Sequence, residues 1–230
     1  MEKNILVTGA NGALGSVVTR HLINLGYKVT AIDNSMEKIS DLIPSGSFRF
    51  YGADVTDEKE MEGLIPKIIQ SEGQIHGALL LVGGFKYGNI SETGLESLTD
   101  MIRWNFFSAY NVARIIFKHM YENSYGRIIF ISSRQGLEPK LGSKTVGYTL
   151  GKNMLISYSD ILNSATDGRD ITSSVIVPSI IDTPSNRRAM PGADTSKWVS
   201  PTAIAEIIEL VFSEKGNAMR ENIIKMYNFS

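Results

Sequence analysis

Short runs of apolar and β-branched residues alternate along the chain with longer segments in which apolar residues recur every three or four positions. The short runs are predicted to be strands, and they cover residues 4–9, 28–33, 47–55, 75–84, 126–133, 170–178 and 221–228. The run at 75–84 is almost unbroken in its apolar character, which is typical of a strand that is buried on both faces.

The longer segments are predicted to be helices. They cover residues 12–26, 36–43, 57–73, about 95–122, the segment that carries residues 148–152, and 200–212. Alternation of strand and helix implies parallel strands that are joined by right-handed crossovers. The predicted fold class is therefore α/β, with a single doubly wound parallel sheet and helices on both faces.

The whole chain, residues 1–230, is predicted to form one domain. Hydrophobic residues make up 43% of it and charged residues 20%, which suits a globule with a sizeable core. No repeat, low-complexity tract or linker divides it. Residues 184–199 form a long stretch with weak periodicity, and a loop of that length is usually functional or disordered. We expect this stretch to form a lid over a substrate site.

Composition and charge exclude several classes of function. The chain has no cysteine, which excludes disulfides, thiol catalysis and zinc–thiolate sites, and no metal site is expected. Its net charge of -1 gives no long-range attraction to nucleic acid or to acidic membranes. No secretory signal is evident, and no apolar run reaches the about 18 residues that span a bilayer. We expect a cytoplasmic protein that acts on a small molecule.

A glycine-rich turn joins the first strand to the first helix. In "TGANGALG" (8–15), the glycines are spaced G-x-x-G-x-x-G. Gly9 permits a sharp turn, Gly12 lets a pyrophosphate approach the backbone, and Gly15 lets the helix pack closely on the strand. The helix N-terminus then offers unpaired N–H groups to phosphates. The alternative is a glycine-rich turn that binds nothing, which the strand–turn–helix context disfavours.

Two carboxylates follow later strands. Asp33 ends the second strand, 18 residues after Gly15, where a carboxylate can accept hydrogen bonds from both ribose hydroxyls and would repel a 2′-phosphate. No arginine follows it directly, so we expect NAD(H) to be preferred over NADP(H); the alternative is that Asp33 only caps a turn. Asp54 and Val55 follow the third strand, where they could hold an adenine ring, or Asp54 could equally cap a helix.

A phenol and an amine lie one helical turn apart in "GYTLGK" (147–152). Tyr148 and Lys152 would leave the same helix face. A free tyrosine has a pKa of about 10, and a nearby cation lowers it, so Lys152 and a positively charged nicotinamide would together acidify Tyr148. By itself, this spacing usually marks an ordinary helix surface; together with the glycine turn it favours proton transfer by Tyr148 to or from a substrate oxygen.

Two more polar residues belong with this pair. Ser133 follows the fifth strand, and ligands bind beyond the carboxyl ends of strands in doubly wound sheets. Asn105 lies in the middle of a long apolar helix pattern, where a polar side chain needs a partner. Ser133 could hold a substrate oxygen while a bound cofactor carries the hydride.

These motifs, with "PSIIDTP" at 178–184, resemble the short-chain dehydrogenase/reductase family over almost the whole chain. The resemblance implies a Rossmann fold and a catalytic tetrad of Asn105, Ser133, Tyr148 and Lys152. It also implies that the lysine binds the nicotinamide ribose and that Asn105 supports a bound water in a proton relay. It further implies a homodimer or homotetramer.

The chain departs from the family pattern at several positions. Ala13 stands at the usual middle glycine, with Gly12 one step earlier, as in dihydropteridine reductase-like members; "LVGG" (81–84) replaces the usual "NNAG"; and Ser179 follows Pro178 instead of glycine. The expected cofactor-binding residues are Gly9, Asn11, Gly12, Ala13, Leu14, Gly15, Asp33, Asp54, Val55, Val82, Gly83, Gly84, Tyr148, Lys152, Pro178, Ile181 and Thr183.

The substrate pocket is expected between segments 83–89, 134–145 and 183–198, with Phe85, Gln135, Arg187 and Trp198 as candidate substrate contacts. Basic residues in the lid suggest an anionic substrate, although basic loop residues are usually solvated. The predicted function is hydride transfer between a nicotinamide cofactor and a carbonyl/hydroxyl substrate. The alternatives are a catalytically silent NAD(P)-binding sensor and, more weakly, a pteridine reductase.

Overall fold

Seven parallel strands form one sheet in the computed structural model, which describes residues 3–229. Their order across the sheet is β3-β2-β1-β4-β5-β6-β7. The strands are β1 Asn4–Thr8, β2 Lys28–Asp33, β3 Phe48–Gly52, β4 Gly77–Leu80, β5 Tyr125–Ile131, β6 Asp170–Pro178 and β7 Ile223–Met226. The predicted doubly wound parallel sheet is confirmed.

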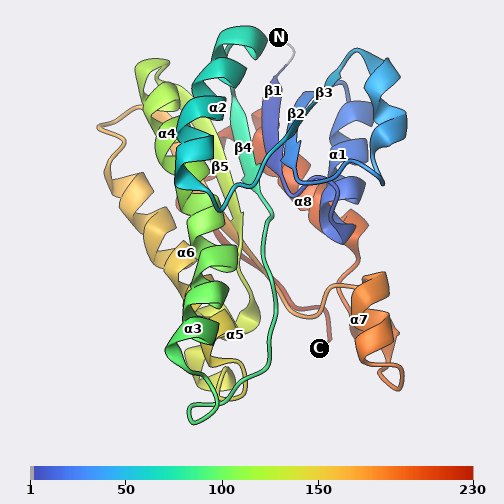
Figure 1. Cartoon of the computed structure of the whole chain (residues 1–230). Coiled ribbons are helices and arrows are strands. Elements are labelled where there is room, and N and C mark those ends of the chain that lie inside the picture. The colour runs from blue at the N-terminus through green and yellow to red at the C-terminus, as the bar shows by residue number, and fades with distance from the viewer. Residues whose placement is uncertain (1–2, 230) are drawn as a thin grey trace.

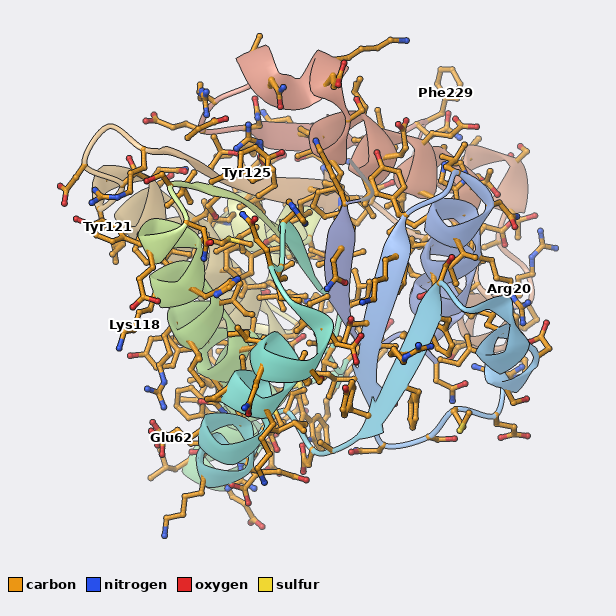
Figure 2. All side chains as sticks on the ribbon, turned by 90° about the horizontal axis from the view of Figure 1, so that it is seen from above. Arg20, Glu62, Lys118, Tyr121, Tyr125 and Phe229 are labelled. Carbon is orange, nitrogen blue, oxygen red and sulfur yellow. The ribbon has the colours of Figure 1, made fainter. Side chains whose placement is uncertain are left out.

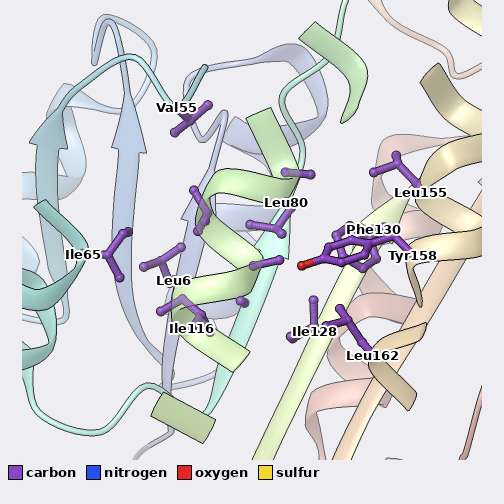
Figure 3. Packing of buried hydrophobic residues seen from close by; sticks show 14 of the residues in the cluster. Leu6, Val55, Ile65, Leu80, Ile116, Ile128, Phe130, Leu155, Tyr158 and Leu162 are labelled. Atoms are coloured by element: carbon purple, nitrogen blue, oxygen red, sulfur yellow. The ribbon is translucent and has the colours of Figure 1, made fainter. Parts of the chain in front are cut away.

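Helices cover both faces of the sheet (Figure 1). On one face lie α1 Ala13–Asn24 and α8 Pro201–Phe212; on the other lie α2 Glu58–Glu72, α4 Ser108–Glu122 and α6 Val146–Ser164. Each face has its own hydrophobic core. Figure 3 shows the core under α2, α4 and α6, where Leu6, Leu80 and Phe130 of the strands meet Ile116 and Tyr158 of the helices.

Polar residues end the helices and cover the outside of the molecule. Asp57 accepts a hydrogen bond from the backbone of Glu60 and caps α2, and Ser200 caps α8 in the same way, as N-cap side chains do. In the view from above, the labelled side chains of Arg20 and Lys118 stand on the outer sides of their helices (Figure 2). Among the described residues, no helix is long and apolar enough to cross a membrane.

The prediction of a helix at 36–43 is wrong. A 3-10 helix spans Ser40–Ser45 instead, and Ile39 is the buried apolar residue that precedes it. Such a short segment gains too little packing to offset the cost of nucleating an α-helix.

The predicted helix at 95–122 is continuous but changes its winding. It consists of α3 Leu95–Ile102, a π-helical turn Arg103–Phe107 and α4. The structure also has short elements within segments predicted as loops: α5 Arg134–Leu137, α7 Pro184–Ala189, and 3-10 turns Pro139–Leu141, Thr195–Lys197 and Glu214–Ala218. Elements this short have no apolar repeat that a sequence pattern could detect.

The strand order reverses direction at the centre of the sheet. From β1 the chain continues to β2 and β3 on one side, and then crosses to β4 on the other side of β1. The connections that leave β1 and β4 therefore part from each other, which opens a crevice beyond the carboxyl ends of these two strands.

Candidate active site

The glycine turn lies at this crevice and is held by its own backbone. Gly9 has φ 70°, a conformation that favours glycine, and its N–H donates to Ile32 O at 3.0 Å. The N–H of Gly12, the residue before α1, donates to Gly9 O at 3.0 Å. A Cβ on Gly15 would overlap the carbonyl group of Gly9, so α1 can approach the turn only with glycine there.

The Asp33 carboxylate is tied to this turn. The Asn11 N–H donates to Asp33 Oδ2 at 2.9 Å, and the Lys38 N–H donates to Asn11 Oδ1 at 2.6 Å. These bonds hold the end of β2 against the glycine turn. Asp33 also lines a cavity of about 180 Å³.

This cavity lies where the sequence predicts adenine. Its lining includes Asp33, Asp54, Val55, Val82 and Trp104. The residue that caps α2 is Asp57, whereas Asp54 accepts from the Thr56 N–H at 2.8 Å, so the helix-capping alternative for Asp54 is wrong. Trp104 was not predicted from the sequence as a residue of this cavity. Its position directly before Asn105, a predicted site residue, could have indicated it.

A second cavity of about 270 Å³ runs along the carboxyl ends of β4, β5 and β6. It brings together most of the predicted catalytic and nicotinamide-side residues: Leu14, Gly83, Gly84, Asn105, Ser133, Tyr148, Lys152, Pro178 and Ile181. Thr183 is buried and its hydroxyl accepts from the Asn186 N–H as the cap of α7; it does not line this cavity.

Lys152 is buried beneath the cavity floor, with 7% of its surface exposed. Its ammonium donates to Ile131 O at 2.8 Å, and Ser132 Oγ donates to Lys152 O at 2.7 Å. Burial lowers the pKa of Lys152 to about 8, because a low-dielectric environment disfavours the charged form. Ser132 is a positioning residue that the sequence interpretation set aside in favour of Ser133.

Glycines on α6 let this helix approach the π-helical turn. Added Cβ atoms on Gly147 and Gly151 would lie 3.0 Å from the Cβ atoms of Met101 and Asn105, respectively. This close packing places Lys152 beside Asn105, and a Cβ on Gly83 would lie 2.8 Å from Asn105 Oδ1 and 3.0 Å from Lys152 Nζ. The "LVGG" variant therefore passes closely over both side chains.

Asn105 is fully buried and holds the segment after β4. Its Nδ2 donates to Gly84 O and to Met101 O, each at 2.9 Å, and its Oδ1 accepts from the Gly84 N–H at 3.3 Å. A π-helical turn at this point fits the tendency of such turns to mark functional sites. Asn105, the polar residue within the apolar helix pattern, thus has the hydrogen-bond partners that the sequence analysis expected.

Tyr148 lies at the junction of the 270 Å³ cavity and a third cavity of about 430 Å³, because its side chain lines both. Burial raises the pKa of Tyr148 above its ordinary value and outweighs the opposite influence of the neighbouring Ser133 hydroxyl. Lys152 does not contribute to this shift. The prediction that Lys152 and a positively charged nicotinamide together acidify Tyr148 stays a prediction; in the protein alone the ammonium donates to Ile131 O.

The third cavity adjoins Tyr148 on the side of α5 and α7. Phe85 and Gln135, predicted as substrate contacts, line it, together with Tyr87, Leu141, Asn186 and Met190, which were not predicted by number. Arg187 and Trp198 do not line it. Arg187 is paired with Asp182 at 2.6 Å, and Trp198 is 5% exposed, so both assignments are corrected.

The chain belongs to the short-chain dehydrogenase family, since the family model described as short chain dehydrogenase matches residues 3–193. It is therefore an oxidoreductase of the nicotinamide-dependent class. Within residues 3–229, no cluster of three or more His, Asp or Glu side chains could hold a metal ion.

Particular relatives are distant. Acetoacetyl-CoA reductase from Acinetobacter sp. (strain RA3849) is 26% identical over 190 residues, 80% of this chain and 76% of that protein. Dihydropteridine reductase from Dictyostelium discoideum is 28% identical over 219 residues, 95% of this chain and 90% of that protein. The structure of ElxO with NADP bound superposes with a TM-score of 0.89 at 23% identity, covering 98% of this chain and 97% of that chain, which supports the shared fold.

Proposed function

We propose that this protein reduces a carbonyl group, or oxidises the corresponding alcohol, with Tyr148 as the group that donates or accepts the proton. The observation that carries the proposal is the place of Tyr148 at the junction of the 270 Å³ cavity and the adjoining 430 Å³ pocket. Its raised pKa keeps the phenol protonated at neutral pH, which suits a proton donor in the reductive direction.

The residues fit a nicotinamide dinucleotide. Gly15 packs so closely on Gly9 that it cannot carry a side chain, and the N-terminus of α1 that follows the turn offers N–H groups to phosphates. Gly83 passes closely over Lys152 at the same cleft. When bound, the cofactor supplies or accepts the hydride. Ser133 orients the Tyr148 hydroxyl, and Lys152 holds a positive charge beneath the nicotinamide ribose of the bound cofactor. Asn105 fixes the position of the segment at Gly83 and Gly84.

We further infer that NAD(H) is preferred over NADP(H). The Asp33 carboxylate lines the presumed adenosine cavity together with Asp54, so two negative charges would oppose a 2′-phosphate. ElxO, which shares the fold at 23% identity, was solved with NADP bound; turnover with NADH compared with turnover with NADPH tests the preference in this chain.

A second candidate is reduction of a dihydropteridine. It is favoured by the similarity to dihydropteridine reductase over 95% of the chain and by the resemblance of the glycine turn to that of dihydropteridine reductase-like members. This candidate uses the same cofactor cleft, so a dihydropteridine belongs in the substrate panel beside simple ketones and keto-acyl thioesters.

The test is oxidation of NADH and NADPH against this panel, with a Tyr148→Phe variant as the matched control. We expect turnover by the unaltered protein to fall about 10²–10⁴-fold in the variant, while fluorescence titration shows NADH binding unchanged. Binding of NADH without turnover of any compound by the unaltered protein would instead support the sensor alternative. The cytoplasmic location stays a prediction.

We also propose that the protein assembles as a homodimer or homotetramer through the α3–α4 and α6 face. Phe107, Tyr110 and Leu150 on this face are 40%, 37% and 44% exposed, which leaves apolar surface uncovered in the single chain. Tyr158 is buried and belongs to the core. Light scattering that gives the mass of a single chain at working concentration would contradict this assembly.

A further inference from the structure

Two aromatic side chains stand exposed on the segment that follows β4. Phe85 is 52% exposed and Tyr87 is 72% exposed. The rings of Phe85 and Tyr87 pack edge to face with centroids 4.9 Å apart, and those of Phe85 and Tyr148 do the same at 5.0 Å. Tyr148, Phe85 and Tyr87 therefore form a continuous row of rings, which we call the aromatic row, from the proposed proton donor to the pocket entrance.

The aromatic row is one side of the 430 Å³ pocket, and other apolar side chains complete it. Leu141, Ala189 and Met190 line the same pocket, and Leu141 is 46% exposed. Pockets with largely apolar walls and a few polar groups are typical of small-molecule sites. Ser133 and Tyr148 are among the polar groups of this pocket, and both also line the 270 Å³ cavity, so the carbonyl would lie beside them.

The row is held in place by the backbone. The Gly88 N–H donates to Lys144 O at 2.9 Å, and the Val146 N–H donates to Gly88 O at 3.0 Å. These bonds join the segment after Tyr87 to the start of α6, the helix that carries Tyr148. A rigid wall binds a rigid partner with less loss of conformational freedom.

Charge recognition has little support in this pocket. Arg134 is its charged lining residue, and its guanidinium lies over the Tyr227 ring at 4.9 Å and within 3.6 Å of Glu138. Of the three basic residues predicted for the lid, Arg187 is paired with Asp182 and Lys197 with Asp194, whereas Arg188 is exposed and does not line the pocket. An anionic substrate would have to compete with these carboxylates.

Resting on the proposed function, we propose that the substrate is a neutral carbonyl compound whose carbonyl is attached to a flat conjugated ring, with that ring packed against Phe85 and Tyr87. In the reductive direction the carbonyl carbon gains the hydride from the reduced nicotinamide and the oxygen gains the proton of Tyr148. One C–H and one O–H bond replace the C=O π bond, and the cofactor is oxidised. Ring contacts of this kind favour a flat ring over a puckered ring of equal size.

A matched pair of ketones tests the proposal. Phenyl methyl ketone and cyclohexyl methyl ketone differ in whether the ring is flat and conjugated. We expect kcat/KM with NADH to favour the phenyl compound by about fivefold to tenfold. We expect Phe85→Leu, which keeps apolar bulk and loses the ring, to abolish this preference at saturating NADH.

The control is Ile90→Ala, an exposed apolar residue outside the pocket lining, which should leave the preference unchanged. Equal kcat/KM values for the two ketones, or a preference that survives in Phe85→Leu, would overturn the proposal while leaving carbonyl reduction in place.

If neither ketone is turned over, calorimetric affinities of the two ketones for the NADH-loaded protein still decide the matter. Tighter binding of the phenyl compound that is lost in Phe85→Leu supports the aromatic row as the ring site, while the proposed function is decided separately by the full panel of carbonyl compounds. Equal affinities overturn the inference.

Discussion

The two halves of the candidate active site are built in different ways. The dinucleotide half is made of backbone: the turn at Gly9 and Gly15, the Asn11–Asp33 hydrogen bond of 2.9 Å and the close passage of Gly83 over Lys152. The substrate half is made of exposed side chains on connecting segments, such as Phe85, Tyr87 and Leu141.

This difference teaches how each half should respond to change. A site formed by closely packed main chain has no space for an added methyl group. Such a group must displace the main chain and the helix packed behind it. A site lined by exposed side chains can lose atoms at small cost to folding, because those atoms were not part of the core. The first half should thus be intolerant of substitution, whereas the second should mainly change selectivity.

The largest expected effect comes from Gly15→Ala in the dinucleotide half. The new Cβ overlaps the Gly9 carbonyl, so we expect a loss of about 1–3 kcal/mol in unfolding free energy. We also expect the Kd for NADH to rise at least about tenfold. Urea unfolding and fluorescence titration measure the two effects.

The matched control is Gly63→Ala on α2, where an added Cβ meets no atom within 4 Å. It should raise stability by about 0.5–1 kcal/mol, because alanine is the better helix former. Equal behaviour of the two variants would contradict the contrast between a packed turn and an open helix face.

The next effect is the pH dependence of reduction. Burial lowers the pKa of Lys152 to about 8, so its positive charge is present below that pH and is lost above it. Tyr148, with its raised pKa, stays protonated through the same range. We expect kcat/KM for reduction to be level below pH about 8 and to fall about tenfold per unit above it.

Thermal melts over the same pH range serve as the control for unfolding. Burying the Lys152 charge destabilises the fold at low pH, and its contribution improves as pH rises through about 8. Lost activity above that pH is thus not explained by this group unfolding the protein. A rate that stays level well above pH about 8 would contradict the role of the Lys152 cation.

A smaller effect is expected on coenzyme choice. Asp33→Asn removes the charge at the presumed ribose site, so the ratio of kcat/KM for NADH to that for NADPH should fall about tenfold, equivalent to 1.4 kcal/mol. The control is Glu37→Gln, an exposed residue four positions later. If both variants shift the ratio equally, long-range charge and not the Asp33 contact sets the preference.

The smallest effect is expected in the substrate half. Leu141→Ala removes exposed apolar surface from the pocket wall, so KM for a bulky ketone should rise about twofold to fivefold through lost apolar contact. The unfolding free energy should change by less than about 0.5 kcal/mol. A large loss of stability would show that this wall is as tightly built as the glycine turn.

Much of the fold follows from local pattern. Strand and helix periodicity predicted the seven parallel strands and the main helices, and the spacing of Gly9, Gly12 and Gly15 predicted the turn. Single residues also predicted where a helix begins, as the N-cap residue Ser200 does for α8. The short elements α5 and α7 were missed because so few residues carry no repeat.

The site divides in the same way. Asn105, Ser133, Tyr148 and Lys152 could be named because each residue type suits one chemical task at one place in the pattern, and the structure brings them around one cleft. Their actual partners could not be foreseen. The Lys152 ammonium turns to Ile131 O, and Arg187 turns to Asp182.

The amino-acid sequence by itself determined the parallel α/β fold, the dinucleotide turn and the residue types available for proton transfer, because these depend on spacing along the chain. Only the tertiary structure decided which side chains meet. It placed Trp104 at the presumed adenine cavity and Phe85 beside Tyr148, because contacts between distant segments depend on how helices pack and where loops return, and no local repeat records them.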